Sequence, residues 1–133
     1  MIGRVGASRL SLVGGILVVI VGIVHTIATP MVHQGLSGAI GDKALGLAYF
    51  FAAMGVYVVL AGWLMIFCSR GLARGERWAW LISVVNGGAN AVGGVGAVAV
   101  GFTNPFVWTW LLASAVIAVG VLLSSPAFRA SVA

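Results

Sequence analysis

Four long apolar stretches constrain what this chain can fold into more than any other feature of its sequence. They cover residues 10–29, 44–68, 78–101 and 106–123, and each is long enough to cross a hydrocarbon core of about 30 Å as a helix. Charged residues make up 7% of the chain, whereas soluble domains contain about 25%. Inside lipid, a helix satisfies its own backbone hydrogen bonds. The sequence therefore predicts an all-α membrane protein: a single membrane domain, residues 1–133, folded as a four-transmembrane-helix bundle.

Basic residues predict which side of the membrane each end of the chain occupies. Six of the seven basic residues fall where a four-span path places them on one side: Arg4, Arg9, Arg70, Arg74, Arg77 and Arg129. Lys43 is the basic residue expected on the other side. Because cytoplasmic segments carry the excess of arginine and lysine, both termini are expected to be cytoplasmic. Membrane orientation thus accounts for the net charge of +5, and no nucleic-acid partner is predicted.

Small residues in the third stretch predict a helix-packing face. Asn86 and Asn90 lie four positions apart and therefore share one face of a helix. The small residues expected to pack there are Gly87, Gly93, Gly94, Ala97 and Gly101. Small residues let membrane helices approach closely, and amides form hydrogen bonds between them. Gly55 and Gly62 indicate similar contacts in the second stretch. The sequence leaves open whether the Asn86–Gly101 face packs within the bundle or against a neighbouring protein.

His25 is the only ionisable side chain inside an apolar stretch, which makes it a candidate ligand-binding residue. In the functional interpretation it serves a proton relay, ligates a metal or haem, or donates a hydrogen bond to a bound molecule. In the structural interpretation it is a neutral histidine bonded to another helix, through Asn86, Asn90 or a backbone carbonyl, with Asn90 favoured over Asn86. We favour the structural interpretation, because polar groups in membrane bundles usually join helices.

Residues 30–43 are expected to form a loop on the outer side. Pro30 is expected to end the first helix, and the half-apolar segment after it is expected to lie against the membrane. Together with His25, His33 and Asp42 form a set that can hold a metal on paper. Because their spacing matches no metal-binding motif, no metal site is predicted.

Two tyrosines of the second stretch are the remaining candidate ligand-binding residues. Tyr49 and Tyr57, with the aromatic residues beside them, can line a pocket for a flat lipophilic molecule such as a quinone. Interface and packing roles are commoner for such residues. No carboxylate lies inside an apolar stretch and no nucleophile or phosphate-loop motif occurs, so no catalytic residue is predicted.

Two short motifs resemble those of small four-helix bacterial membrane proteins. Residues 22–26 (GIVHT) and residues 75–79 (GERWA) are similar to segments of DoxX-like proteins and of families of unknown function. The resemblance implies a single-domain, multi-pass protein of the bacterial inner (plasma) membrane. It assigns no catalytic residue, although DoxX itself is tied to quinone-linked oxidation.

Three functions are compatible with these features. We expect a non-catalytic membrane protein, an accessory or structural subunit that packs through Gly-rich helix faces in a larger complex or a homo-oligomer. The alternative is a bundle that binds a small lipophilic molecule (a quinone, a lipid or haem) near His25, Asn86, Asn90, Tyr49 and Tyr57. A small transporter or channel is the third, because a transport path normally needs more intramembrane polar groups than this chain has. No cofactor is predicted outside the alternative.

Overall fold

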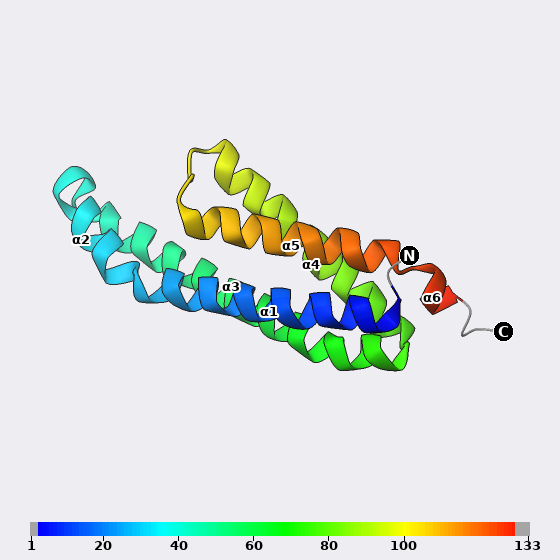
Figure 1. The fold of residues 1–133 in the computed structure, drawn as a ribbon. Helices are drawn as coiled ribbons and strands as arrows, with labels where there is room; N and C mark the ends of the chain where they lie inside the picture. The colour runs from blue at the N-terminus through cyan, green and yellow to red at the C-terminus, as the bar shows by residue number, and fades with distance from the viewer. Residues whose placement is uncertain (1–2, 130–133) are drawn as a thin grey trace.

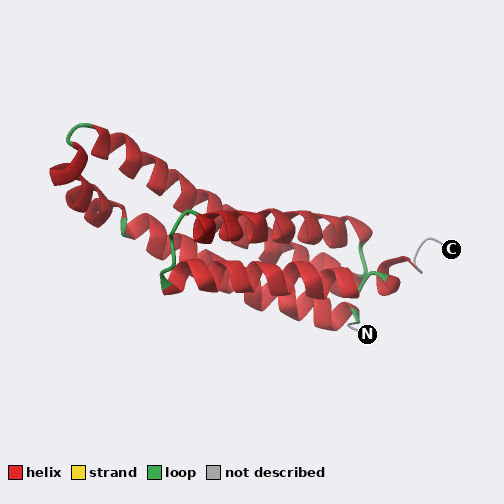
Figure 2. Cartoon of the chain, turned by 90° about the horizontal axis from the view of Figure 1, so that it is seen from above, coloured by secondary structure: helices red, strands yellow, loops and turns green. Residues whose placement is uncertain are grey.

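The computed structural model describes residues 3–129, which form helices and connecting turns and contain no strand (Figures 1 and 2). Four helices are long and apolar enough to cross a membrane: α1 (Arg4–Ile27), α3 (Lys43–Arg74), α4 (Arg77–Ala99) and α5 (Pro105–Leu123). Two shorter helices, α2 (Thr29–Ile40) and α6 (Pro126–Arg129), follow α1 and α5. The predicted all-helical fold with four helices of membrane-spanning length is confirmed.

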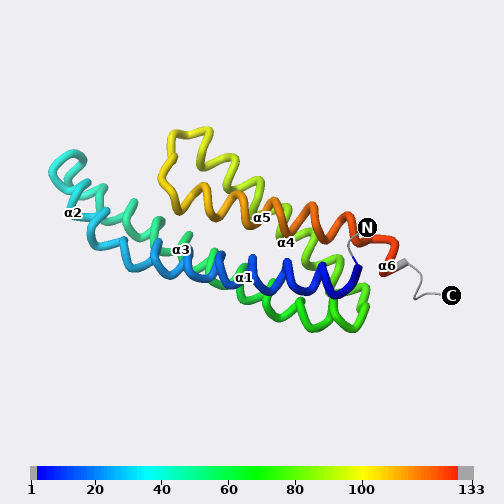
Figure 3. Tube along the Cα trace, in the orientation of Figure 1, coloured from blue at the N-terminus to red at the C-terminus, as the bar shows by residue number. Residues whose placement is uncertain are grey.

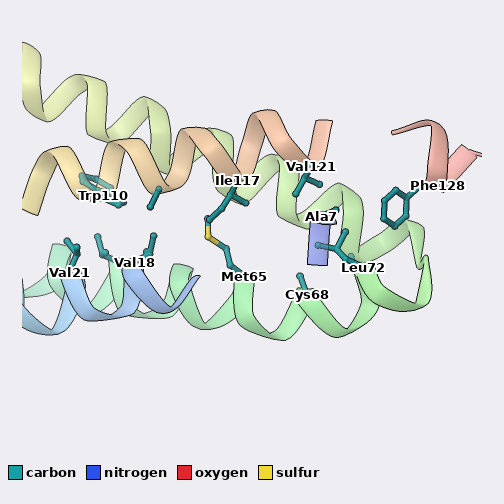
Figure 4. Close-up of a cluster of buried hydrophobic side chains, with 13 residues drawn as sticks. Ala7, Val18, Val21, Met65, Cys68, Leu72, Trp110, Ile117, Val121 and Phe128 are labelled. Atoms are coloured by element: carbon teal, nitrogen blue, oxygen red, sulfur yellow. The ribbon is translucent and has the colours of Figure 1, made fainter. Parts of the chain in front are cut away.

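The four long helices lie side by side in two antiparallel pairs. α1 runs along most of α3, and α4 pairs with α5 (Figure 3). The α4–α5 pair packs on the first pair through two interfaces, α5 against α1 and α4 against α3. Between them lies a core of apolar side chains that includes Val18, Met65, Ile117 and Val121, all fully buried (Figure 4). Large apolar side chains of all four long helices also cover the exterior, as lipid contact requires.

The segment after α1 differs from the expected loop. α1 ends at Ile27, the chain keeps a right-handed helical conformation at Ala28, and α2 begins at Thr29. Pro30 lies in the first turn of α2, where its missing N–H costs no hydrogen bond. The prediction that residues 30–43 form a loop is therefore wrong. Pro30 bends the helical path instead of ending it, and the continuation packs along α3.

The helix α3 is longer at its C-terminal end than predicted, reaching Arg74 instead of residue 68. Its end is set by Gly75, which has a φ of +79° that glycine adopts without strain. The N–H of Gly75 bonds the carbonyl of Leu72, and the N–H of Glu76 bonds the carbonyl of Gly71. These two bonds form a Schellman cap. Leu72 is fully buried, so packing as well as capping favours the extra turns.

At one end of the molecule, α2 and the start of α3 project past the loop that joins α4 to α5. The turn that joins α2 to α3 lies well beyond the loop that joins α4 to α5 (Figures 1 and 2). We call α2 together with the first two turns of α3, residues 43–50, the projecting hairpin. No residue of α2 is buried. Arg4, the α3–α4 turn and α6 lie at the opposite end, which we call the basic end.

Candidate functional site

Two asparagines of α4 connect three helices. Asn86 donates from Nδ2 to the carbonyl oxygen of Ala61 in α3 at 2.9 Å. Asn90 is fully buried, and its Oδ1 accepts from the indole Nε1 of Trp110 in α5 at 3.1 Å. Nδ2 of Asn90 donates to the carbonyl oxygen of Asn86 at 2.8 Å. Trp110 was not predicted to take part, because spacing along α4 does not show which residue of another helix faces it.

The closest helix–helix contact lies between α1 and α3. A Cβ atom on Gly15 would lie 2.9 Å from the carbonyl oxygen of Gly62, and one on Gly62 would lie 2.7 Å from that of Gly15. Two turns away, a Cβ atom on Gly22 would lie 2.9 Å from the carbonyl oxygen of Gly55. The two pairs are seven positions apart on each helix, so one antiparallel register covers the interface. Gly15 and Gly22 were not singled out from the sequence, although their equal spacing with Gly55 and Gly62 was the available signal.

The small residues of α4 and of the turn after it have different neighbours and do not form one packing face. Cβ atoms on Gly87 and Gly94 would lie 3.2 Å from Ala118 and 2.9 Å from Leu111, so both glycines face α5 of the same chain. A Cβ atom on Gly93 would meet the indole ring of Trp110 at 3.1 Å. Ala97 is partly buried and packs on the core. Gly101 lies beyond the end of α4, in a turn with φ +96°, and a Cβ atom there would have no atom of the described part of the chain within 4 Å.

His25 stacks on Phe51 of α3, with ring centroids 3.6 Å apart and planes inclined by 18°. Its Nε2 atom is buried and has no hydrogen-bond partner within residues 3–129. His25 forms no hydrogen bond with Asn90, so the favoured partner differs from the prediction, and the backbone of Phe51 in α3 takes that place. Asn90 instead accepts from Trp110 and donates to Asn86.

Two further polar atoms share the surroundings of His25. Thr29 Oγ1 and His33 Nδ1 are also buried without a partner in the described part of the chain. The three residues are spaced by four positions across the bend at Ala28, so they lie along the side of α1 and α2 that packs on α3. A buried polar atom without a partner costs about 1–3 kcal/mol, so this side has unused hydrogen-bonding capacity.

A groove and a cavity are formed at the surface of the described residues. A groove of about 240 Å³ between α1 and α3 has an apolar lining of Ile23, Thr26, Ile27, Val56, Val59 and Leu60. A cavity of about 130 Å³ at the basic end is lined by Arg77, Trp80, Ser125 and Phe128. Tyr49 and Tyr57 line neither, and they are 78% and 44% exposed. Both tyrosine side chains therefore face outward from the described part of the chain.

Metal-ligating side chains are dispersed over the fold. Among the described residues, no three histidine, cysteine or acidic side chains come together as a possible metal site. His25, His33 and Asp42 thus do not form the set that the sequence allowed on paper. Cys68 is free and buried in the core.

Charged groups gather at the basic end. Arg4 donates from Nε to the carbonyl oxygen of Ala127 at 2.9 Å, which fixes α6 against the start of α1. The Arg4 guanidinium also lies against the α3–α4 turn, where a Cβ atom on Gly75 would be 2.6 Å from its Cζ. Arg74 forms an ion pair with Glu76. The hydrogen bond from Arg74 holds the pKa of the Glu76 carboxyl below its usual value.

Comparison with protein-family models, with curated proteins and with solved structures gives no match for this chain. The resemblance of residues 22–26 and 75–79 to DoxX-like proteins stays a prediction.

Proposed function

We propose that this chain is a non-catalytic membrane protein that serves as an accessory or structural subunit of a larger membrane complex. It crosses the bacterial inner membrane four times, with both termini in the cytoplasm. The observation that carries the proposal is the projecting hairpin, which extends past the α4–α5 loop and exposes apolar side chains there (Figure 1).

Helix lengths set how much of the chain one bilayer can cover. At about 1.5 Å per residue, the 32 residues of α3 span about 48 Å and the 19 residues of α5 about 28 Å. A hydrocarbon core of about 30 Å matches α5 and leaves several turns of α3 outside it. A tilt of α3 would place more of that helix inside the hydrocarbon core, but the rest of the bundle, including α5, would tilt with it. The basic end is fixed by its arginines at the headgroups, so the excess length emerges at the projecting hairpin.

The projecting hairpin has an apolar surface that water does not favour. Met31 is 75% exposed, Leu45 is 66% exposed and Tyr49 is 78% exposed. Large apolar groups that are exposed outside the hydrocarbon core are characteristic of protein–protein contact sites. A partner subunit that covers them removes apolar area from water, at about 25 cal/mol per Å². We therefore assign the projecting hairpin as the contact surface for that partner.

The buried amides support a structural role for the spanning part. Asn86 and Asn90 use their side chains to join α3, α4 and α5, as described above. Ser11 adds a bond of 2.7 Å from its hydroxyl to the carbonyl oxygen of Met65, which joins α1 to α3. Trp80 donates to the carbonyl oxygen of Val121 at 2.8 Å. These groups stabilise one arrangement of the helices, which suits a rigid subunit.

A matched pair of leucines tests this proposal. Leu45 and Leu60 both belong to α3 and are 66% and 63% exposed, but only Leu45 lies in the projecting hairpin. After extraction of the tagged protein in mild detergent, we expect Leu45→Ala to weaken retention of a stoichiometric protein partner about tenfold, as for an apolar interface residue. Leu60→Ala should leave retention unchanged. Equal effects of the two changes, or a wild-type protein that elutes as a single chain, would contradict the proposal.

A second function is favoured by the unpaired atoms near His25. His25 Nε2, Thr29 Oγ1 and His33 Nδ1 offer three hydrogen-bonding positions along α1 and α2. A small lipophilic molecule with a polar head, such as a quinone or a lipid, would satisfy them. This alternative requires a molecule that stays bound through purification.

A further inference from the structure

The cavity of about 130 Å³ at the basic end combines four residues with complementary chemistry. Arg77 and Trp80 come from the first turn of α4, while Ser125 and Phe128 come from the turn after α5 and from α6. The cavity therefore lies between two segments that the bond from Arg4 to Ala127 and the bond from Trp80 to Val121 hold in place. Phe128 is 2% exposed and lines one side of the cavity.

The polar groups of this cavity are available to a ligand. Arg77 is exposed and has no ion-pair or hydrogen-bond partner among residues 3–129, unlike Arg4 and Arg74, which are engaged. The Ser125 hydroxyl likewise makes no hydrogen bond within the described residues, whereas the neighbouring Ser124 hydroxyl bonds the carbonyl of Val121. The indole N–H of Trp80 is used by Val121, so its ring contributes an apolar surface.

We propose that this cavity binds the phosphate of an anionic phospholipid. Arg77 supplies the positive charge and Ser125 a hydroxyl donor, while Trp80 and Phe128 contact the glycerol and the first acyl carbons. The cavity lies where α4 begins and α5 ends, at the depth of the lipid headgroups in a bilayer that the helices span. Arg9 and Arg70, which are exposed at the same end, add to the positive potential. Basic pockets between membrane helices on the cytoplasmic side are suited to such headgroups.

Two features favour a lipid over a soluble anion. Two of the four lining residues are aromatic, and amphipathic tryptophan rings are favoured at the membrane interface. The only acidic residue of this end within residues 3–129, Glu76, is paired with Arg74 and so does not compete for Arg77. A phosphate diester that carries acyl chains uses the charge, the hydroxyl and the rings together, whereas inorganic phosphate uses the polar groups alone.

Native mass spectrometry of the delipidated full-length protein tests the proposal. The probes are phosphatidylglycerol, the zwitterionic phosphatidylcholine and inorganic phosphate, each titrated separately. We expect preferential binding of phosphatidylglycerol, and an Arg77→Gln change should weaken it about fivefold, the effect of one basic residue near an anionic surface. Arg70→Gln removes the same charge from an exposed arginine outside the cavity and should change the affinity less than twofold. Ser125→Ala should weaken the affinity without any change in charge.

The following outcomes would overturn the proposal. Equal losses in the Arg77→Gln and Arg70→Gln proteins would mean that the whole basic end attracts anionic lipid without a site. Inorganic phosphate that binds as tightly as phosphatidylglycerol, with the same dependence on Arg77, would make this a site for a soluble anion. Circular dichroism of each variant verifies its helix content. Should Arg77→Gln fail to fold, an unchanged affinity in the Ser125→Ala protein would decide against the cavity.

Discussion

At the scale of the residue, the environment of His25 separates the two proposed functions. Its Nε2 atom is buried and has no hydrogen-bond partner among residues 3–129, so an apolar side chain of similar size removes a desolvation penalty while keeping contact with Phe51. For an empty site we expect His25→Leu to change the free energy of unfolding by no more than about 1 kcal/mol, or to increase it. Unfolding in mixed micelles, followed by circular dichroism, measures this change.

Asn90→Leu is the matched control for His25→Leu. It leaves the indole N–H of Trp110 without its partner in the core, so it should destabilise the protein by about 1–3 kcal/mol. If the wild-type protein retains a quinone or a lipid in stoichiometric amount and His25→Leu releases it from a stable fold, the subunit proposal fails. The lipophile-binding function would then replace it.

At the scale of the element, the contact between α1 and α3 depends on glycine at the crossing points. A Cβ atom on Gly62 would lie 2.7 Å from the carbonyl oxygen of Gly15 and from the backbone N of Val19. Because backbone atoms cannot rotate away, we expect Gly62→Ala to destabilise the protein by about 1–3 kcal/mol. Gly46 belongs to the same helix, and a Cβ atom on it would have no atom of the described residues within 4 Å. Gly46→Ala should therefore stabilise the protein by up to about 1 kcal/mol, since alanine is the better helix former. Unfolding curves that shift in the same direction for both variants would contradict this role.

The elements also show how far the sequence could predict this fold. The apolar stretches predicted four helices correctly, because hydropathy depends on composition within one segment. The helix at residues 29–40 was missed, because Pro30 is compatible both with the end of a helix and with its first turn. The partner of Asn90 and the surroundings of His25 depend on how α1, α4 and α5 face one another. Such contacts between helices cannot be deduced from the spacing of residues along a single helix.

At the scale of the whole molecule, orientation decides which side each proposed surface occupies. Arg4, Arg70, Arg74 and Arg77 lie at the basic end, whereas Lys43 lies at the projecting hairpin. The excess of arginine predicts that the basic end faces the cytoplasm, where anionic headgroups are available to the Arg77 cavity. The projecting hairpin then meets its partner on the outer side. The two proposals thus share one orientation, and that orientation is itself testable.

Single cysteines at the two ends test the orientation. In a Cys68→Ala background, which removes the native thiol, Ser37→Cys places a thiol on exposed α2 and Ala73→Cys places one on the exposed side of α3 at the basic end. With a membrane-impermeant maleimide applied to right-side-out vesicles, we expect Ser37→Cys to be labelled at once and Ala73→Cys only after permeabilisation. The reverse pattern would place the arginines outside, against the charge asymmetry, and would move the projecting hairpin to the cytoplasm. Partial labelling of both would mean that six arginines against one lysine do not fix the insertion of this chain.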